Sequence, residues 1–470
     1  MFVGRKHELA QLEKLYRRDG FQMTVVYGRR RVGKTTLINE FARNKRTLSF
    51  TALDQSDTNN LADFTRVVST FFGLPSSLGA FGSWADAFSY IANQAMQERL
   101  VFIFDEFPYA AKRNSSLPSA LQIAIDHDFA GKEILLILCG SDQGFMESEV
   151  LGRKSPLYGR RTAQIHLGQL GFRDAAALLP ELSAQEAFRF YGCFGGVPYY
   201  LKQVDAAESL EENLAELYFD PTGFLFDEPY ALLRQELSEP ALYNSILRAI
   251  ASGANKPKEI ADATGITRTS LPRYLKTLER LQIIEKAVPF GENPETSKRS
   301  LYRIVDACYE FWFRFVMPRT SDIEAGLGRA VVRNLPKQQV DDYLGHRFER
   351  VCAEWLTEQA VAGTLPIEAT AVGSWWGTNP RTRSQDDIDV LAADRTSNTL
   401  LIGECKYRES FDETAELADL EDKRELIKGF RATHLYLFSK HPLSEGTQEK
   451  ASTQSDVHLV TLDDLYATSP

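Results

Sequence analysis

The sequence predicts a multidomain α/β protein, and three observations support this fold class. At 470 residues the chain is too long for one compact core, so two to four domains are expected. Short apolar runs in the first 170 residues are separated by a helical pattern, which indicates a parallel sheet. A second alternation, in the order αβββαβ, begins near residue 339. The composition, with 43% hydrophobic and 25% charged residues, is that of an ordinary globular protein.

The start of the chain, MFVGRKHELA, has charges where a signal peptide needs an apolar stretch. No run approaches the ~20 apolar residues that span a bilayer, so we expect a cytoplasmic protein without membrane contact. Five scattered cysteines without a CxxC pair indicate reduced, mostly buried thiols. The net charge of −10 argues against a protein that coats nucleic acid everywhere, but residues 1–50 and 256–303 are basic. Residues 204–240 are acidic and contain FDPTGFLFDEP, which we interpret as a domain junction.

A loop between a strand and a helix carries the clearest motif. The apolar run at 23–28 is followed by helical spacing at 36–43, and the loop between them, GRRRVGKT, matches GxxxxGK[ST]. Backbone N–H groups of such a loop cradle phosphates, and its lysine reaches the β and γ oxygens. We therefore expect ATP and Mg²⁺ as cofactors, with the metal on the Thr35 hydroxyl. The residues expected to bind nucleotide are Gly28, Arg31, Gly33, Lys34, Thr35 and Thr36.

Two further strands complete this predicted site. The buried run LVFIFDEF ends in Asp105 and Glu106 at the edge where parallel sheets bind ligands, so we expect Asp105 to bind Mg²⁺ and Glu106 to act as the general base. The next strand ends in Ser141, which either senses the γ-phosphate or forms an ordinary turn. Arg160 and Arg161 follow; they either stabilise the transition state, within one subunit or in a homo-oligomer, or are ordinary surface residues.

These residues resemble a known family. The segments FVGRKHELAQL, GRRRVGKTTLINEF, FIFDEFPYA, CGSDQGFM and GGVPYYL look like the archaeal-type P-loop ATPases, relatives of the AAA+ and STAND ATPases. The resemblance covers most of residues 1–235 and implies an ATPase core at 1–170 with a helical lid at 171–236. It also implies that the adenine base of the nucleotide lies near the residues Val3, Gly4, Arg5 and Pro198.

A winged helix-turn-helix is expected at 237–315. Three helical patterns, PALYNSILRAIASG, KPKEIADATG and TRTSLPRYLKTLERLQII, precede two β-like runs around the polar loop GENPETSKR. The third helix is expected to begin at Thr267 as its cap. Its basic side chains either contact DNA phosphates in the major groove, or the module serves as a hinge or autoinhibitory surface. These side chains are Arg268, Arg273, Lys276 and Arg280.

The last domain is expected at 316–470. The aromatic stretch YRIVDACYEFWFRFV before it is interpreted as core. An amphipathic helix at 339–360 precedes strands near 367–374, 387–393 and 399–405, and a charged helix and a fourth strand follow at 413–429 and 434–439.

Charged residues occupy particular places on these strands. Asp387 and Asp389 lie two apart and so share one face of a strand, as do Glu404 and Lys406. Carboxylates placed in this way hold one or two Mg²⁺ ions against a phosphodiester, and the lysine orients water or stabilises negative charge. Glu349 on the preceding helix completes the expected ring, and either or both aspartates serve as ligands.

The pattern IDV…GECK resembles the D…ExK core of the PD-(D/E)xK, or restriction-endonuclease-like, fold in the version attached to archaeal-type ATPases. GSWWG at 373–377 and the aromatic stretch are similar to that fused domain as well. The resemblance implies a metal-dependent DNA endonuclease. The alternatives are a nuclease fold kept for binding without cutting, and solvated charges on an edge strand.

Together these features predict an ATP-hydrolysing, DNA-directed protein whose nucleotide state controls a nuclease, a combination suited to defence or repair. The alternative is a non-cleaving, STAND-like signalling or DNA-binding ATPase. A scaffold with vestigial sites is a third interpretation.

Overall fold

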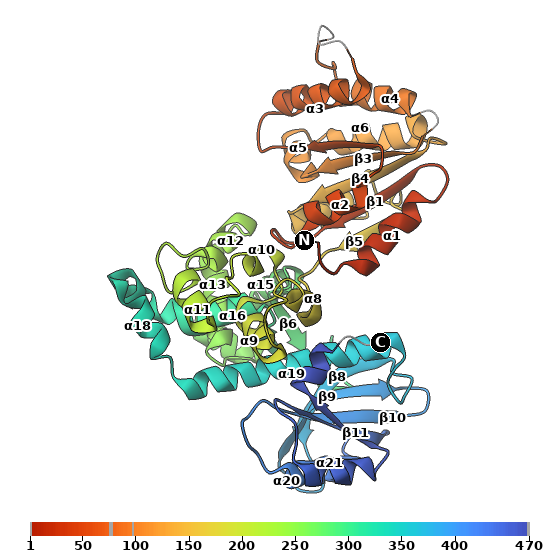
Figure 1. The fold of residues 1–470 in the computed structure, drawn as a ribbon. Coiled ribbons are helices and arrows are strands. Elements are labelled where there is room, and N and C mark those ends of the chain that lie inside the picture. The colour runs from red at the N-terminus through yellow and green to blue at the C-terminus, as the bar shows by residue number, and fades with distance from the viewer. Residues whose placement is uncertain (1, 75–78, 96–97, 468–470) are drawn as a thin grey trace. The chain divides into compact units, whose positions relative to one another are not determined.

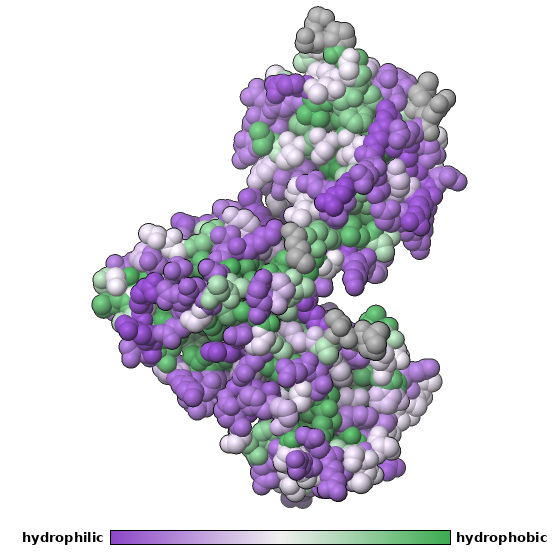
Figure 2. All heavy atoms as spheres, in the orientation of Figure 1, coloured by the Kyte–Doolittle hydropathy of each residue, from purple (hydrophilic) through white to green (hydrophobic). Residues whose placement is uncertain are grey.

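The computed structural model describes residues 2–74, 79–95 and 98–467, and it divides into two compact units (Figure 1). The first unit comprises Met1–Leu170 and Val197–Tyr199, and the second comprises Gly171–Gly196 and Tyr200–Pro470. Hydrophilic residues cover most of the face seen in Figure 2. Within the described ranges, no helix combines the length and the apolar character that a membrane crossing requires. The cysteines are free and mostly buried, as predicted.

The first unit is built on a parallel five-stranded sheet in the order β2-β3-β4-β1-β5. Strands β1, β3 and β4 are buried along almost their whole length, as expected for strands covered on both faces. The central strand β1 pairs with β4 on one side and β5 on the other, so the loop after it lies at the middle of the sheet. The strands are β1 (Gln22–Tyr27), β2 (Thr47–Thr51), β3 (Leu100–Asp105), β4 (Ile134–Gly140) and β5 (Ala163–His166).

Helices cover both faces of this sheet (Figure 1). Helices α3 to α6 pack on one face, where Phe64 contacts Phe50, Trp84 and Phe104. Helices α1 and α2 pack on the other face through a smaller apolar cluster. The helical segments are α1 (Lys6–Tyr16), α2 (Lys34–Ala42), α3 (Asp57–Phe72), α4 (Trp84–Gln94), α5 (Phe107–Arg113), α6 (Leu117–Ile123), η1 (Ala124–Asp128), α7 (Gln143–Phe145) and η2 (Met146–Val150).

The second unit begins with helices that pack onto its later elements. Helix α9 is fixed at its start by a capping box between Ser183 and Glu186, and its buried face contacts the long helix α19. Tyr343 Oη of α19 donates to the Gly192 carbonyl of α9 at 2.5 Å. The helices of this region are α8 (Phe172–Ala176), α9 (Ala184–Phe194), α10 (Pro198–Leu201), α11 (Leu210–Leu217) and α12 (Glu228–Glu236), of which α10 is divided between the two units.

A three-helix module with a two-stranded wing follows. Helices α13 (Pro240–Ala251), α14 (Pro257–Thr264) and α15 (Leu271–Arg280) precede the antiparallel pair β6 (Ile284–Ala287) and β7 (Leu301–Ile304). The expected start of the third helix at Thr267 is wrong. Residues 268–270 form a turn first, and α15 begins after Ser270 without a side-chain cap.

The loop between β6 and β7, residues 288–300, is here called the wing, and it packs against the C-terminal sheet. The Phe290 N–H donates to the Ser374 carbonyl at 2.9 Å, and Arg299 Nη1 donates to the Trp376 carbonyl at 2.9 Å. The Phe290 ring stands edge-on to Phe430, with centroids 5.4 Å apart. The wing is therefore anchored on the edge strand β8.

The aromatic stretch predicted as core is buried. Tyr309, Phe311 and Phe315 are almost completely excluded from solvent, and Phe311 and Phe315 pack with Tyr343 of α19. This region contains α16 (Ala307–Phe311), η3 (Trp312–Val316), η4 (Met317–Arg319), α17 (Thr320–Asp322), η5 (Ile323–Leu327) and α18 (Gly328–Arg333).

The C-terminal domain is a five-stranded sheet in the order β12-β11-β10-β9-β8. Strands β8, β9 and β10 form an antiparallel meander, and β10, β11 and β12 run parallel. Helix α19 crosses one face and α20 lies on the other (Figure 1). The elements are α19 (Lys337–Ala362), β8 (Ala371–Thr378), β9 (Gln385–Asp394), β10 (Thr399–Lys406), α20 (Glu413–Asp422), β11 (Arg431–Ser439), α21 (Glu445–Ser452), β12 (Val457–Thr461) and α22 (Leu462–Tyr466).

The αβββαβ order is present, but the bounds of its first strand and its charged helix differ from those expected. The first strand begins at Ala371 instead of near 367. The charged helix ends at Asp422 instead of 429, because the chain then turns and buries Leu426 and Ile427 in the core of the sheet. The pattern did not predict α21, β12 and α22.

Candidate functional site

The loop after β1 has two glycines with distinct roles. A side chain at Gly28 would place its Cβ 2.2 Å from the Leu167 carbonyl oxygen of the neighbouring chain segment, so only glycine fits there. Gly33 has φ +94°, a left-handed conformation that favours glycine, and it directly precedes α2. The loop therefore turns sharply from the centre of the sheet into a helix N-terminus, where backbone N–H groups attract anions.

Lys34 lies within this loop. Its ammonium donates to the carbonyl oxygens of Gly28 at 2.8 Å and Arg29 at 3.0 Å, and the residue is only 7% exposed. Thr35 and Thr36 follow on the first turn of α2 and are exposed. The predicted phosphate-binding groups are thus gathered at one helix N-terminus.

The predicted metal pair is in direct contact. The Thr35 hydroxyl donates to Asp105 Oδ2 at 3.0 Å, although the two residues are 70 positions apart. The other oxygen of this buried carboxylate accepts from the Glu106 N–H at 2.9 Å. A hydroxyl beside a carboxylate is the ligand pair that holds Mg²⁺ in P-loop proteins.

Glu106 is held by the end of the adjacent strand. Its Oε2 accepts from the Ser141 hydroxyl at 2.9 Å and from the Ser141 N–H at 3.1 Å. Glu106 also has a left-handed backbone, with φ +50°, and its side chain reaches Ser141 at the end of β4. Ser141, predicted as a contact of the nucleotide, therefore contacts the predicted base.

The residues that the family resemblance placed near the adenine base lie around the phosphate-binding loop in the first unit. Arg5 Nη2 donates to the Gly168 carbonyl at 2.6 Å and the Val32 carbonyl at 3.1 Å, directly after Val3 and Gly4 in the chain. Pro198 adjoins Gly33, since a Cβ at Gly33 would lie 3.8 Å from Pro198 Cγ. The Arg31 guanidinium stands over the Tyr199 ring at 5.3 Å.

The two candidate arginines differ in their surroundings. Arg160 pairs with Asp126, at 2.7 Å from Nη2 to Oδ2, and this bond lowers the pKa of Asp126. Arg161 acts on Tyr27, the last residue of β1. Burial and Glu147 raise the pKa of Tyr27, and Arg161 opposes that shift. Arg160 is therefore held in an ion pair, whereas Arg161 influences the last residue of β1.

The second candidate site is a cavity of about 680 Å³ within the second unit. Its charged lining comes from α19, from Asp389 on β9 and from the end of β10, with further charged side chains from η3, from the segment after β10 and from Lys440 after β11. Four predicted residues line it together, namely Glu349, Asp389, Glu404 and Lys406. Charged side chains that are far apart in the sequence therefore line one cavity.

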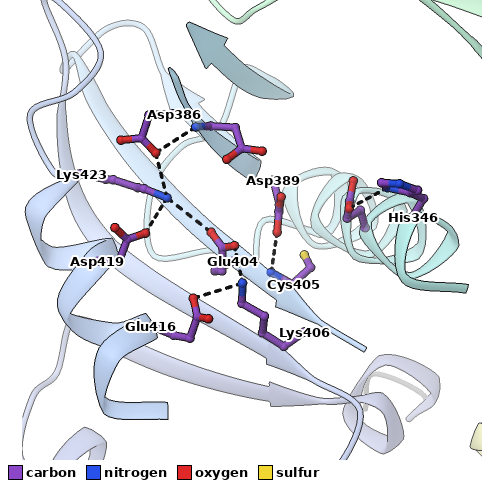
Figure 3. A network of polar contacts seen from close by, with 11 residues as sticks. His346, Asp386, Asp389, Glu404, Cys405, Lys406, Glu416, Asp419 and Lys423 are labelled. Atoms are coloured by element: carbon purple, nitrogen blue, oxygen red, sulfur yellow. Dashed lines mark hydrogen bonds and ion pairs between the residues drawn. The ribbon is translucent and has the colours of Figure 1, made fainter. Parts of the chain in front are cut away.

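Strand separation creates this site. The β9–β10 ladder ends at the pair Gly403 and Val390, and beyond it the strands part. Asp389 spans the gap and accepts from the Cys405 N–H at 2.8 Å (Figure 3). Burial, followed by the negative charges of Glu404 and Glu349, raises the pKa of Asp389 well above its usual value.

Glu404 lies between two lysines (Figure 3). Lys406 Nζ is 2.8 Å from its Oε1, and Lys423 Nζ is 3.8 Å from its Oε2. Burial lowers the pKa of the Lys406 ammonium, but its bonds to Glu404 and Glu416 outweigh burial and raise it overall. Both oxygens of the predicted ligand therefore face an ammonium group.

Asp387 and Glu349 occupy the side of the site toward the winged helix. Asp387, Asp389 and Glu349 line an adjoining cavity of about 280 Å³. Burial and Glu404 raise the pKa of Asp387, and Glu349 is 3.1 Å from His346 Nδ1. Among the residues that the structure describes, no three His, Cys, Asp or Glu side chains are grouped closely enough to hold a metal ion as they stand.

The pattern analysis missed Lys423 and the carboxylates around it. Lys423 is 6% exposed and pairs with Asp386 at 3.3 Å and Asp419 at 2.6 Å. Asp419 and Lys423 have the i, i+4 spacing of a helical ion pair, which is the one available signal. That spacing gives no indication that Glu404 lies beside them.

The third helix of the winged module, α15, and the turn before it present basic residues to solvent. Arg268, Arg273 and Lys276 are exposed, and Arg273 pairs with Glu239 at 3.4 Å. Arg268 lies 3.8 Å from Asp262. Exposed pairs of this kind contribute little to stability, so these side chains remain accessible for phosphates.

Comparison with protein families matches three parts of the chain. Residues 2–204 match an ATPase domain predominantly from Archaea, and residues 245–287 match the IclR helix-turn-helix domain. Residues 312–417 match a domain described as that of archaeal and bacterial proteins of unknown function. The expected P-loop ATPase domain and helix-turn-helix are thereby confirmed.

Similar proteins come from archaea. The protein MJECL04 of Methanocaldococcus jannaschii is 29% identical over 467 residues, which cover 99% of this chain and 100% of that protein. The ATP-binding protein MJ0423 of the same organism is 50% identical over 46 residues, 10% of this chain and 78% of that protein. Among solved structures, the Walker-type ATPase PABY2304 of Pyrococcus abyssi has a TM-score of 0.49 and 19% identity, covering 67% of this chain and 96% of that chain.

The family match at 2–204 includes the first unit, which contains the phosphate-binding loop and the Thr35–Asp105 pair, and extends into the helices that follow it. The match to MJ0423, which covers most of that protein, agrees with this assignment. The chain therefore belongs to the family of ATP-binding proteins whose ATPase domain is found predominantly in Archaea.

Proposed function

We propose that this ATPase is DNA-directed and that its nucleotide state controls a metal-dependent nuclease of the PD-(D/E)xK type. The observation that carries the proposal is the shared cavity of Asp389, Glu404 and Lys406. The strand order of the C-terminal sheet, a meander followed by a parallel strand after a helix, supports it. Such coupling suits defence against foreign DNA or repair.

The donor set fits a hard divalent cation. Asp389 and Glu404 would hold Mg²⁺ or Mn²⁺ through oxygen, with Asp387 and Glu349 beside them. Burial is the main reason that the pKa of Asp389 is raised, and the negative charges of Glu404 and Glu349 add to it. A bound cation would offset that repulsion. When bound, the metal supplies polarisation of the phosphodiester and a more acidic water. Lys406 would stabilise negative charge on the phosphate, since its ammonium lies in the same cavity.

In the ATPase domain the roles follow the positions of the side chains. Lys34 would bind the β- and γ-phosphates, and Thr35 and Asp105 would hold the nucleotide's Mg²⁺. Glu106 would accept the proton of the attacking water, with Ser141 fixing its carboxylate. Arg161 is favoured over Arg160 as the arginine that acts on the γ-phosphate, because Arg160 is paired with Asp126. Val3, Gly4, Arg5 and Pro198 would surround the adenine.

A route for control runs through α9. Gly195 and Gly196 connect this helix to Val197–Tyr199, which cluster with the ATPase unit. At its other face α9 is bonded to α19 through Gly192 and Tyr343. A nucleotide-dependent shift of the Pro198 segment would thus be passed to α19, and α19 carries Glu349.

The test is cleavage of plasmid and linear DNA by the full chain with ATP and either Mg²⁺ or Mn²⁺. Cleavage that depends on metal, and that is lost in Lys406→Ala and Asp389→Asn, supports the nuclease. Lys450→Ala is the matched control, because Lys450 is an exposed lysine on α21. If wild type and Lys406→Ala are equally inactive with every metal, the nuclease assignment is wrong.

A second function is a DNA-binding regulator that hydrolyses ATP without cutting. One observation favours it: the two oxygens of Glu404 face lysines rather than an assembled set of acidic ligands. In that case DNA binding in a gel-shift assay would survive Asp389→Ala, and ATP hydrolysis would persist in both proteins.

A further inference from the structure

We propose that helix α20 sets the affinity of the C-terminal site for a divalent cation, by holding Lys406 and Lys423 between Glu404 and its own carboxylates. The proposal rests on the metal-dependent function proposed above. It assigns positioning roles to Glu416, Asp419 and Lys423, none of which lies in the IDV…GECK pattern.

Each lysine is shared between Glu404 and α20. Lys406 Nζ is 2.8 Å from Glu404 and 3.1 Å from Glu416. Lys423 Nζ is 3.8 Å from Glu404 and 2.6 Å from Asp419. Figure 3 shows the two ammonium groups on either side of the Glu404 carboxylate, with the α20 carboxylates beyond them.

Burial makes this sharing consequential. The side chains of Glu404, Lys406 and Lys423 are 12%, 17% and 6% exposed. Charges in such surroundings interact more strongly than in water, and a buried ammonium cannot simply move into solvent when it leaves one partner. An ammonium released by Glu404 therefore needs another carboxylate, and Glu416, Asp386 and Asp419 are already in contact.

A cation that binds Glu404 competes with these lysines. The α20 carboxylates lower the energy of the state in which the lysines have moved away from Glu404. Removing Glu416 leaves Lys406 paired with Glu404. Removing Asp419 leaves Lys423 to Asp386 and Glu404. Either change makes the lysine harder to draw away from Glu404 and so weakens cation binding. Removing Lys423 frees one oxygen of Glu404 and therefore strengthens cation binding. If these residues only stabilised the fold, removing the carboxylate and removing the lysine would change the affinity for the cation in the same direction.

The test is titration of the full chain with Mn²⁺, followed by calorimetry, alongside thermal melting of each protein. We expect Asp419→Asn and Glu416→Gln to weaken Mn²⁺ binding at this site on the order of tenfold, and Lys423→Met to strengthen it by a similar factor. The double variant Asp419→Asn with Lys423→Met should bind like Lys423→Met, because Asp419 acts through that lysine. Asp389→Asn identifies which binding event belongs to this site.

Asp422→Asn is the matched control, since Asp422 carries the same charge on the same helix but is exposed and has no ion pair with either lysine. Equal effects of Asp419→Asn and Asp422→Asn would overturn the proposal. So would Lys423→Met binding that equals or falls below wild type; Glu416→Gln gives an independent result if Lys423→Met does not fold. If wild type shows no Mn²⁺ binding that Asp389→Asn removes, the metal-dependent function falls as well; if that binding exists and α20 variants leave it unchanged, only this inference falls.

Discussion

The Ser141 hydroxyl and backbone N–H both bind Oε2 of Glu106, at 2.9 and 3.1 Å, and so tie the end of β4 to the residue after β3. This contact fixes a carboxylate beside the phosphate-binding loop. Its effect on ATP hydrolysis can be measured directly.

Ser141→Ala is expected to lower kcat for ATP hydrolysis about tenfold, with little change in nucleotide affinity, because one of the two bonds to the general base is lost. Glu106→Gln should lower kcat by about 10²–10⁴. Steady-state phosphate release checks both. Ser148→Ala, an exposed serine on η2, is the control. Full activity of Ser141→Ala beside inactive Glu106→Gln would exclude a positioning role for Ser141.

Two helical glycines of the second unit should respond to alanine with opposite signs. A Cβ at Gly328 would lie 1.6 Å from the Phe219 carbonyl oxygen, whereas a Cβ at Gly345 meets nothing within 4 Å. Gly345→Ala should stabilise the protein by about 0.5–1 kcal/mol through helix propensity. Gly328→Ala should destabilise it by about 1–3 kcal/mol or more through overpacking. Denaturant unfolding measures both free energies. A Gly328→Ala variant as stable as wild type would contradict the close packing of Gly328 against Phe219.

Glu354 predicts a pH dependence of stability. Burial raises its pKa above the ordinary value of 4.5, although the Phe172 N–H, Tyr191 and neighbouring arginines oppose the shift. A carboxyl with a raised folded-state pKa contributes stability below its unfolded pKa, and that contribution is lost as pH rises through the folded value. Glu354→Gln should therefore gain stability relative to wild type as pH increases from about 4.5. Thermal melts across pH 4 to ~8 measure this; a constant difference between the proteins would show that Glu354 does not titrate abnormally.

The exposed basic face of α15 predicts salt-dependent DNA binding. Arg273→Ala and Lys276→Ala should each weaken binding at all sequences and reduce the salt slope by about 1, as expected for lost phosphate contacts. Fluorescence anisotropy with a labelled duplex at several salt concentrations measures the slope. Lys450→Ala on α21 should leave it unchanged. Slopes equal to wild type in the α15 variants would favour the hinge interpretation.

Local patterns predicted the parts of the fold that depend on neighbouring residues. The strand, loop and helix from 23 to 43 form one continuous segment, so the motif and its flanking periodicity were enough to place Lys34 and Thr35. The αβββαβ order followed from alternation in the same way. Asp389, Glu404 and Lys406 were predicted to meet because strand periodicity places them on shared faces.

Tertiary contacts determined what the patterns did not show. Lys423 lies near Glu404 because α20 packs against β10 and β11. The spacing of residues along the chain does not predict this packing. The charged helix was expected to reach residue 429, but it ends at Asp422, and Leu426 and Ile427 enter the core from the turn that follows. The bond between Ser141 and Glu106 joins residues 35 positions apart. Its signal, a serine at the end of a strand, is common to many turns.

The anchored wing has a consequence for how this chain meets other molecules. Edge strands invite a strand from another chain, and proteins avoid this by covering the edge. Phe290 and Arg299 occupy the carbonyls of Ser374 and Trp376 on β8, so this border of the sheet is shielded against intermolecular pairing. Phe290 and Arg299 therefore hold two parts of the same chain together, the helix-turn-helix module and the C-terminal sheet.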